Sequence, residues 1–313
     1  MSAVDALRSP WIVSKQTDLV WFLGSALAGF LLLLVALFAG GLPVQIFTFW
    51  WVVLDGPHVY STTFRTVFDR AERAKHKDVW LALIPLCLIG PTFYLLGLQR
   101  VFFLLLMTWG QFHIAKQHVG FAMLYRAKVG MRNAASIEKR LILILLALPM
   151  VYYLGKLIGV NLLEFLLAAT GVVFAIYVHS TGMNAQKLTL IVLNCGLWWA
   201  SFLFAATDVN SEPKMLAAVA AMNVGHSLQY LQLGWFHNHN RYSTRTDLLG
   251  LVSRKWLFFF AAALLLAFPF RLMAHFSHML ALSVLGLLML HYLLDARIWR
   301  VRKDPELAPA LKL

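Results

Sequence analysis

Residues 187–206 read KLTLIVLNCGLWWASFLFAA, a continuous apolar segment whose single charged residue, Lys187, lies at its start. A helix that crosses the hydrocarbon core of a bilayer needs about 20 such residues. Large apolar side chains would lie on every side of this helix, so it has no face suited to water. The segment therefore predicts a transmembrane helix, and similar segments follow one another along the chain.

The composition of the whole chain points to the same class of protein. Hydrophobic residues make up 60% of the 313 residues and charged residues only 13%, and the mean hydropathy is +0.72. A soluble domain of this length could not bury that much apolar surface, whereas a membrane protein exposes it to lipid. The two cysteines, Cys87 and Cys195, lie in apolar runs and offer neither a disulfide framework nor a thiolate metal site.

We predict an all-α, polytopic membrane bundle of about ten transmembrane helices. The approximate ranges are 19–41, 43–66, 79–98, 101–125, 141–160, 162–181, 187–206, 215–236, 256–274 and 278–299. We expect a single transmembrane domain over residues 1–313, with residues 1–18 and 300–313 as terminal segments. The first apolar segment lacks the features of a cleaved signal peptide, so we expect it to remain in the mature protein.

Lysine and arginine predict the orientation of the bundle. With the N-terminus in the cytoplasm, about 22 of the 27 basic residues fall on the cytoplasmic side and about four on the other, as the positive-inside rule requires. Both termini are therefore predicted to be cytoplasmic. A basic face beside anionic lipid headgroups explains the net charge of +13, so we expect membrane lipids and no nucleic acid as partners.

Histidines occur on alternate predicted helices, those that run towards the cytoplasm. They are His58, His113, His118, His179, His226 and His291. An ionisable side chain costs about a few kcal/mol in hydrocarbon, so a set at similar depth predicts a functional site. The natural occupant of a histidine cluster is a metal ion.

The second predicted helix carries the sequence LDGPHV, in which Asp55 and His58 share a helix face. Pro57 removes a backbone hydrogen bond and Gly56 permits local unwinding, which is tolerated at membrane depth where backbone lines a cavity or is buried by protein. We predict His58 as a metal ligand and Asp55 as a ligand or as the acceptor that orients the imidazole. A buried Asp–His pair that only stabilises packing is the alternative.

The fourth predicted helix carries His113 and His118, five residues apart. On a regular α-helix they diverge by roughly 140°. Both could reach one metal only through a π-type turn, a distortion that is frequent at functional sites. Without such a turn one of them is a ligand and the other is structural, and we favour His118 slightly.

The eighth and tenth predicted helices complete the candidate set. His226, Gln229 and Tyr230 lie on one face of an unusually polar helix, whose end carries His237 and His239 in a sequence typical of a solvated cap. In the tenth helix His291 and Asp295 are one turn apart. Asp295 could instead pair with an arginine such as Arg65. We predict His58, His113, His118, His226 and His291 as metal ligands and Asp55, Gln229, Tyr230 and Asp295 as catalytic residues.

The donor set favours iron, followed by copper, zinc or manganese, because it combines imidazoles and carboxylates without thiolates. A metal in the inner half of the bilayer would meet substrates that dissolve in hydrocarbon, such as isoprenoids, carotenoids or acyl chains. Oxidation of their C–H or C=C bonds calls for iron and O2. The sequence therefore favours a membrane non-haem iron oxygenase, an oxidoreductase with a lipophilic substrate.

The segments DGPHV (55–59), QHVGF (117–121) and HYLLDARIWR (291–300) resemble a group of bacterial polytopic membrane proteins. In architecture and histidine use the chain is similar to the Brp/Blh family of membrane β-carotene dioxygenases. That resemblance implies one iron held by histidines from several helices, cleavage of a polyene, and a place in the bacterial inner membrane. The H-x-x-H-H boxes of di-iron desaturases are absent from the sequence.

Other classes of function stay open on sequence grounds. A haem-binding electron carrier would use histidine pairs on facing helices as axial ligands. A proton- or metal-coupled transporter would also bury histidine and aspartate, although the repeated halves common in transporters are not visible in this sequence. A structural or assembly subunit could use the polar residues to bind a partner helix. The sequence does not indicate an oligomeric state.

Overall fold

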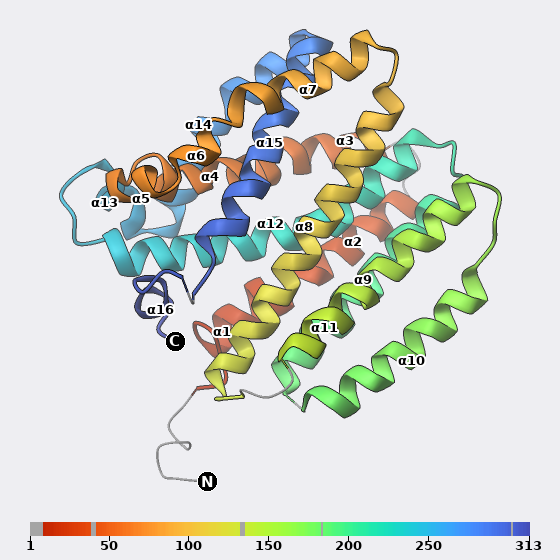
Figure 1. Cartoon of the computed structure of the whole chain (residues 1–313), viewed down its shortest axis with the longest axis horizontal. Helices are drawn as coiled ribbons and strands as arrows, with labels where there is room; N and C mark the ends of the chain where they lie inside the picture. The colour runs from red at the N-terminus through yellow and green to blue at the C-terminus, as the bar shows by residue number, and fades with distance from the viewer. Residues whose placement is uncertain (1–8, 39–41, 132–134, 183, 302) are drawn as a thin grey trace. The chain divides into compact units, whose positions relative to one another are not determined.

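The computed structural model describes residues 9–38, 42–131, 135–182, 184–301 and 303–313. Within these ranges every regular element is a helix (Figure 1). The chain divides into two compact units, and each is described by itself. Unit 1 comprises Met1–Trp50 and Phe112–Gln229 with Leu313, and unit 2 comprises Trp51–Gln111 and Tyr230–Lys312. The predicted all-α class is confirmed, whereas a single domain over residues 1–313 stays a prediction.

Unit 1 is built on α2, α9, α10 and α11. Its helices are α1 (Lys15–Thr17), the π-helix η2 (Asp18–Leu23), α2 (Ser25–Phe38), α3 (Pro43–Phe49), α9 (Ala135–Leu157), α10 (Leu163–Thr181) and α11 (Ala185–Ala206), with parts of α8 (Gln99–Lys128) and α12 (Glu212–Tyr242). α9 packs against α10 and α11, and α2 packs against α11. At Gly29 an added Cβ would lie 2.4 Å from the carbonyl oxygen of Ala221, so glycine allows α2 to approach α12.

A buried ion cluster joins α8, α9, α10 and α11 in unit 1. Glu138 of α9 is fully buried and accepts hydrogen bonds from Arg126 of α8 and Tyr177 of α10. The ammonium of Lys187, the charge at the start of the 187–206 segment, lies 2.8 Å from Oε1 of Glu138. Lys187 also donates to the carbonyl oxygens of Thr181 and Gly182 at the end of α10. The charges are thus satisfied inside the unit instead of facing lipid.

Unit 2 is built on α4, α7, α14 and α15. Its helices are the end of η3 (Trp50–Asp55), α4 (Gly56–Thr66), α5 (Arg70–Lys75), α6 (Lys77–Trp80), α7 (Leu83–Leu95), α13 (Leu248–Arg254), α14 (Trp256–Phe276), α15 (His278–Ile298) and α16 (Leu307–Ala310), with the remainder of α8 and α12. α15 packs along α7 and against α4, and α4 packs against α14 (Figure 1). At Gly286 an added Cβ would lie 2.5 Å from the backbone of Cys87, so this glycine allows α7 and α15 to approach closely.

Seven of the described helical segments are long and apolar enough to cross a membrane. They are Lys15–Phe38, Lys77–Leu95, Ala135–Leu157, Leu163–Thr181, Ala185–Ala206, Trp256–Ala274 and His278–Ile298. The other three predicted segments, 43–66, 101–125 and 215–236, are helical as well, but their polar side chains lower their hydropathy. A helical membrane protein is therefore supported, whereas ten spans and cytoplasmic termini stay predictions.

The helix that carries His58 is distorted one turn before it. Residues Trp50–Asp55 form a π-helix, and Pro57 then lies in the first turn of α4. The sequence predicted local unwinding at Gly56 and Pro57. The structure instead has a wider π-helix before Pro57, which accommodates the backbone hydrogen bond that proline cannot donate. In contrast, α8 is a regular α-helix over Gln99–Lys128, so the π-type turn considered between His113 and His118 is not present.

Glu72 of α5 anchors the connection that follows α4. Its buried carboxylate accepts a hydrogen bond from Lys75 and lies within ion-pair distance of Arg65 and Arg241. Burial opposes ionisation, but the Lys75 hydrogen bond and the two guanidinium charges hold the pKa of Glu72 below its ordinary value of 4.5. A carboxylate with a depressed folded-state pKa stabilises the fold above its unfolded pKa and loses this contribution as pH falls through the folded pKa.

We therefore expect Glu72→Gln to destabilise the protein near neutral pH and to have a smaller effect in acid. Thermal unfolding of both forms in detergent, followed from neutral pH to about pH 3, measures the difference. The difference in unfolding temperature between wild type and Glu72→Gln should be constant well above pH 4.5 and should become smaller below it. A gap that stays constant down to the acid end would show that the charge of Glu72 does not contribute.

Candidate metal centre

Two histidines and one aspartate converge in the interior of unit 2. His58 comes from the first turn of α4, and His291 and Asp295 lie one turn apart on α15. One ligand atom from each of the three side chains lies within 4.8 Å of the others. All three residues are buried, with at most 9% of their surface exposed. The contact between α4 and α15 therefore brings together three side chains of the types that bind first-row metals.

The two imidazoles face each other through the nitrogens that can bind a metal. Nε2 of His58 lies 3.1 Å from Nε2 of His291, and the ring planes are nearly perpendicular, at 87°. Two nitrogens that bind one metal at about 2.1 Å, with a bond angle of about 90–110°, lie about 3.0–3.4 Å apart. Oδ2 of Asp295 is 3.4 Å from Nε2 of His291. These separations are those of adjacent ligands on one ion.

The opposite nitrogen of His58 faces a carboxylate. Nδ1 of His58 lies 3.7 Å from Oδ1 of Asp55, the last residue of the π-helix, and Asp55 is paired with the buried Arg271 of α14. A carboxylate behind an imidazole favours the tautomer with its proton on Nδ1, which leaves Nε2 free for a metal. The guanidinium of Arg271 holds the carboxylate of Asp55 in place. Asp55 is thus placed to orient His58.

The opposite nitrogen of His291 joins a chain of hydroxyl groups. Nδ1 of His291 is 2.8 Å from Oγ1 of Thr62, which is 2.8 Å from the hydroxyl of Tyr230. That hydroxyl donates to Oδ1 of Asp295 at 2.7 Å. Since Tyr230 donates to Asp295, Thr62 donates to Tyr230 and accepts from Nδ1 of His291. This assignment leaves Nε2 of His291 unprotonated, so both facing nitrogens can bind a metal.

The pairing of Arg271 with Asp55 leads to a prediction about metal affinity. Arg271→Gln removes the charge that fixes Asp55, so His58 is held less firmly in its metal-binding tautomer. We expect about 10–100-fold weaker binding of Co(II), the range found for partners of metal ligands. Titration followed by the visible bands of Co(II) measures the affinity. Arg271→Lys, which keeps the charge, should recover part of the loss, and unchanged affinity in Arg271→Gln would contradict the orienting role.

Comparisons with known proteins identify no relative of this chain. No family model, curated protein or solved structure matches the chain. The similarity to the Brp/Blh family therefore stays an expectation from sequence.

His113 and His226, two of the other predicted ligands, lie together in unit 1. Their ring centroids are 5.1 Å apart, with the planes nearly perpendicular at 85°. The side-chain amide of Gln117 donates to the carbonyl oxygen of His226 and to Oε1 of Gln229. Gln229 in turn donates to the carbonyl oxygen of Phe22. Gln229, a predicted catalytic residue, is thus committed to hydrogen bonds within unit 1.

His118 lies apart from His113 on the regular α8 helix. It is fully buried in unit 1, and its ring centroid is 6.5 Å from that of Trp198. Among the described residues neither of its ring nitrogens has a hydrogen-bond partner. The structure therefore does not bring His113 and His118 to a shared position, and the predicted ligand role of His118 stays untested.

Two expectations from sequence differ from the structure in unit 2. Asp295 accepts its hydrogen bond from Tyr230, whereas Arg65 pairs with Glu72 and Asp304. The predicted solvated cap at His237 is wrong, because α12 continues to Tyr242 and buries His237 completely. Nδ1 of His237 is 2.9 Å from Oδ1 of Asn238. The cap expectation failed because the packing partners of α12 come from distant parts of the chain.

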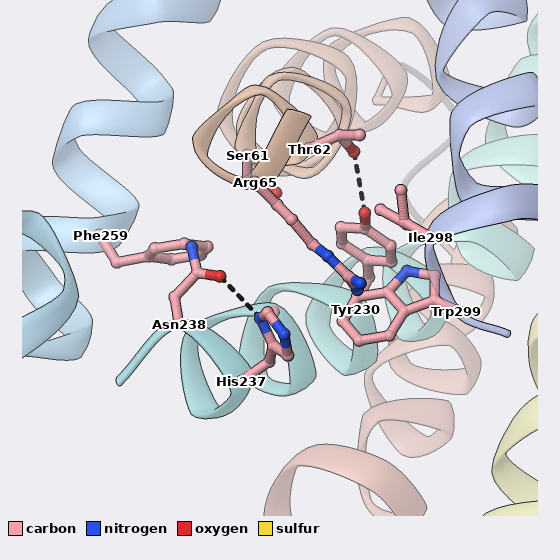
Figure 2. Close-up of a pocket in the computed structure, with 10 residues that line it drawn as sticks. Ser61, Thr62, Arg65, Tyr230, His237, Asn238, Phe259, Ile298 and Trp299 are labelled. Atoms are coloured by element: carbon pink, nitrogen blue, oxygen red, sulfur yellow. Dashed lines mark hydrogen bonds between the residues drawn. The ribbon is translucent and has the colours of Figure 1, made fainter. Parts of the chain in front are cut away.

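A small pocket lies beside the hydroxyl chain in unit 2. It is lined by residues of α4, α12, α14 and α15 together with Trp299 (Figure 2). Thr62 and Tyr230 form its edge towards the metal-ligand set, and Figure 2 shows the bond between them. The space is about 10 Å³, which is room for one water molecule. The surroundings of Tyr230 are therefore nearly dry.

Proposed function

We propose that this chain is a membrane-embedded non-haem iron oxygenase that acts on a lipophilic substrate. The observation that carries the proposal is the set formed by His58, His291 and Asp295, two imidazoles and one carboxylate within bonding reach of one ion. Two histidines and one carboxylate on one face of the metal, with the remaining positions open, are typical of Fe(II) oxygenases. The bound iron would activate O2 at an open position.

The residues of unit 2 have distinct roles in this proposal. His58, His291 and Asp295 hold the metal, and Asp55 and Thr62 each fix one imidazole from behind through its Nδ1. Tyr230 holds the second oxygen of Asp295, so the carboxylate presents Oδ2 to the metal. The ligand set is buried, which excludes bulk water from the reaction.

The lipophilic class of substrate follows from the surroundings of the site. α15, which supplies two of the three ligands, is one of the apolar segments suited to crossing a membrane. A substrate would therefore enter laterally between helices from the hydrocarbon core, and an isoprenoid, a carotenoid or an acyl chain meets this condition. We place the protein in the bacterial inner membrane, with its ligand set in the cytoplasmic half.

The geometry favours an oxygenase over a haem carrier. Opposite axial ligands of a haem iron lie about 4 Å apart, twice a bond of about 2.0 Å. The nitrogens of His58 and His291 are 3.1 Å apart on perpendicular rings, so they suit adjacent positions on one ion. None of the contacts described in unit 2 specifically supports a haem protein or a transporter.

Nitric oxide tests for the open coordination position without knowledge of the substrate. Fe(II) with vacant positions binds nitric oxide and gives a characteristic S = 3/2 electron paramagnetic resonance signal. We expect this signal from iron-loaded wild-type protein and its loss in Asp295→Ala, which removes the carboxylate ligand. Asn238→Ala, a pocket residue outside the ligand set, should keep the signal. Iron-loaded protein that gives no nitrosyl signal would contradict the oxygenase proposal.

A further inference from the structure

Tyr230 lies between the proposed metal ligands and a tryptophan near the edge of unit 2. Its ring centroid is 4.7 Å from that of His58 and 5.4 Å from that of His291. On its other side the ring of Trp299 lies 5.9 Å away in an edge-on contact. Trp299 is the capping residue that follows α15 and is only half-buried. Aromatic rings in successive contact therefore lead from the ligand set towards the surface of unit 2.

The hydrogen bond of Tyr230 suits loss of an electron. A phenol that loses an electron must also release its proton, and a base accepts that proton only from hydrogen-bond distance, about 2.6–3.2 Å. Oδ1 of Asp295 accepts from the Tyr230 hydroxyl at 2.7 Å. The proton can move across this bond and return without passing into bulk water. The pocket beside Tyr230 is too small for bulk water, because it has room for only about one water molecule.

The positive charge beside Trp299 influences whether a radical is more stable on Trp299 or on Tyr230. The guanidinium carbon of Arg65 lies 5.4 Å from the centre of the Trp299 ring, and both residues line the same pocket (Figure 2). An oxidised tryptophan is a cation, so a neighbouring guanidinium raises its energy. An oxidised tyrosine that has passed its proton to Asp295 is neutral. The guanidinium therefore favours a radical on Tyr230 over one on Trp299.

We propose that Tyr230 and Trp299 form a one-electron path between the metal site and the surface of unit 2. In this path Tyr230 gives one electron to the oxidised metal, and its proton passes to Oδ1 of Asp295. An electron from Trp299 then reduces the Tyr230 radical, and the proton returns from Asp295. A one-electron reductant outside the protein, a thiolate or an ene-diol, reduces Trp299. Across the whole sequence one electron leaves the reductant and would reach a metal held by His58, His291 and Asp295, and the protein is unchanged.

The purpose of this path rests on the proposed function. If the protein is an oxygenase, the path would reduce an oxidised metal that forms when O2 reacts without substrate. Its electron-transfer step can be tested on metal-free protein, so that failure of the path is separate from failure of the metal site. A ruthenium polypyridyl group is attached at Arg300→Cys, next to Trp299, in a chain whose Cys87 and Cys195 are replaced by alanine. A laser flash with an added electron acceptor generates Ru(III).

We expect a tyrosyl radical, identified by electron paramagnetic resonance in protein that carries ring-deuterated tyrosine. Tyr230→Phe should abolish the signal, and Trp299→Phe should slow its formation about 10-fold or more. Trp299→Tyr, which keeps an oxidisable ring, should restore the rate. Tyr292→Phe is the matched control, because its ring also lies near His291, at 6.0 Å, and this variant should keep the signal.

Two results would overturn the path. One is a tyrosyl signal of full size in Tyr230→Phe, and the other is an unchanged rate in Trp299→Phe. Helical circular dichroism of each variant shows that the fold is retained. Wild-type protein that forms the Tyr230 radical but binds no metal would leave the electron path standing and would contradict the proposed oxygenase instead.

Discussion

Alanine in place of His58 is expected to abolish iron retention by the purified protein while the helical content stays unchanged. His58 supplies one of two facing Nε2 atoms, 3.1 Å apart, and its removal leaves one imidazole and one carboxylate. Loss of a partner behind a ligand costs about 10–100-fold in affinity, so loss of the ligand itself should cost more than about 100-fold. Elemental analysis and circular dichroism of the same sample measure both effects.

The space that the His58 ring leaves provides a further test. The ring is packed between His291 and Tyr230, with centroid distances of 4.5 and 4.7 Å. Free imidazole should enter this space and restore part of the metal binding in His58→Ala. His237→Ala is the matched control, because His237 is equally buried in unit 2 but is bonded to Asn238. Full iron content in His58→Ala without imidazole would contradict the ligand assignment.

The same experiment with His226→Ala examines the ligands predicted from sequence in unit 1. If the set of His58, His291 and Asp295 suffices, His226→Ala retains iron. If His226 is a ligand, as the sequence predicts, the variant loses iron as His58→Ala does. Because His226 packs against His113 in unit 1, this variant also needs the circular dichroism control.

The second large effect is expected at Glu138, in unit 1. Its carboxylate is fully buried between Arg126 and Lys187, and both cations are themselves nearly inaccessible. Removal of one partner from a buried ion pair costs about 3–5 kcal/mol, because the remaining charge is left uncompensated. Here two cations share the carboxylate, so we expect Glu138→Ala to lower the free energy of unfolding by at least that amount.

Thermal unfolding in detergent, with wild type and Glu138→Ala side by side, measures this loss. Arg297→Gln is the control, since it removes an ion pair with Asp78 in which both side chains are about half exposed, at 44% and 58%. Exposed pairs contribute about 0–1 kcal/mol, so this variant should unfold close to wild type. Equal stability of Glu138→Ala and wild type would show that the buried cluster does not hold unit 1 together.

Apolar length predicted the helices well because lipid imposes one simple requirement on each of them. All ten predicted segments are largely helical where the structure describes them, and their bounds differ by several residues. The three predicted segments that are too polar to count as membrane spans carry His58, His113 and His226, whereas His179 and His291 lie in segments that do count as spans. The number of spans therefore cannot be decided from hydropathy in the region of the site.

Local spacing predicted part of the candidate site. The three-residue separation of Asp55 and His58 and the four-residue separation of His291 and Asp295 placed each pair on one helix face, and both pairs are in contact. Helix periodicity does not show which helices meet. The buried Arg271 of α14, which pairs with Asp55, could therefore not be found from the spacing of residues in the sequence.

Residues in the contact between helices could not be found from sequence. Thr62 of α4 is one such residue, since its hydroxyl is within hydrogen-bond distance of both His291 and Tyr230. A threonine in an apolar helix gives no signal of its own, since its hydroxyl can also bond to the backbone one turn earlier. Trp299 was likewise one of eleven tryptophans in the sequence until the structure placed it beside Tyr230.

The metal content and optical spectrum of wild-type protein, purified in detergent and reconstituted with Fe(II), are the most direct test of the metal site. We expect close to one iron per chain, no Soret band, and loss of that iron in both His58→Ala and Asp295→Ala. A Soret band would place the chain among haem proteins. Absence of bound metal after reconstitution would contradict the metal site and favour a transporter or an assembly subunit.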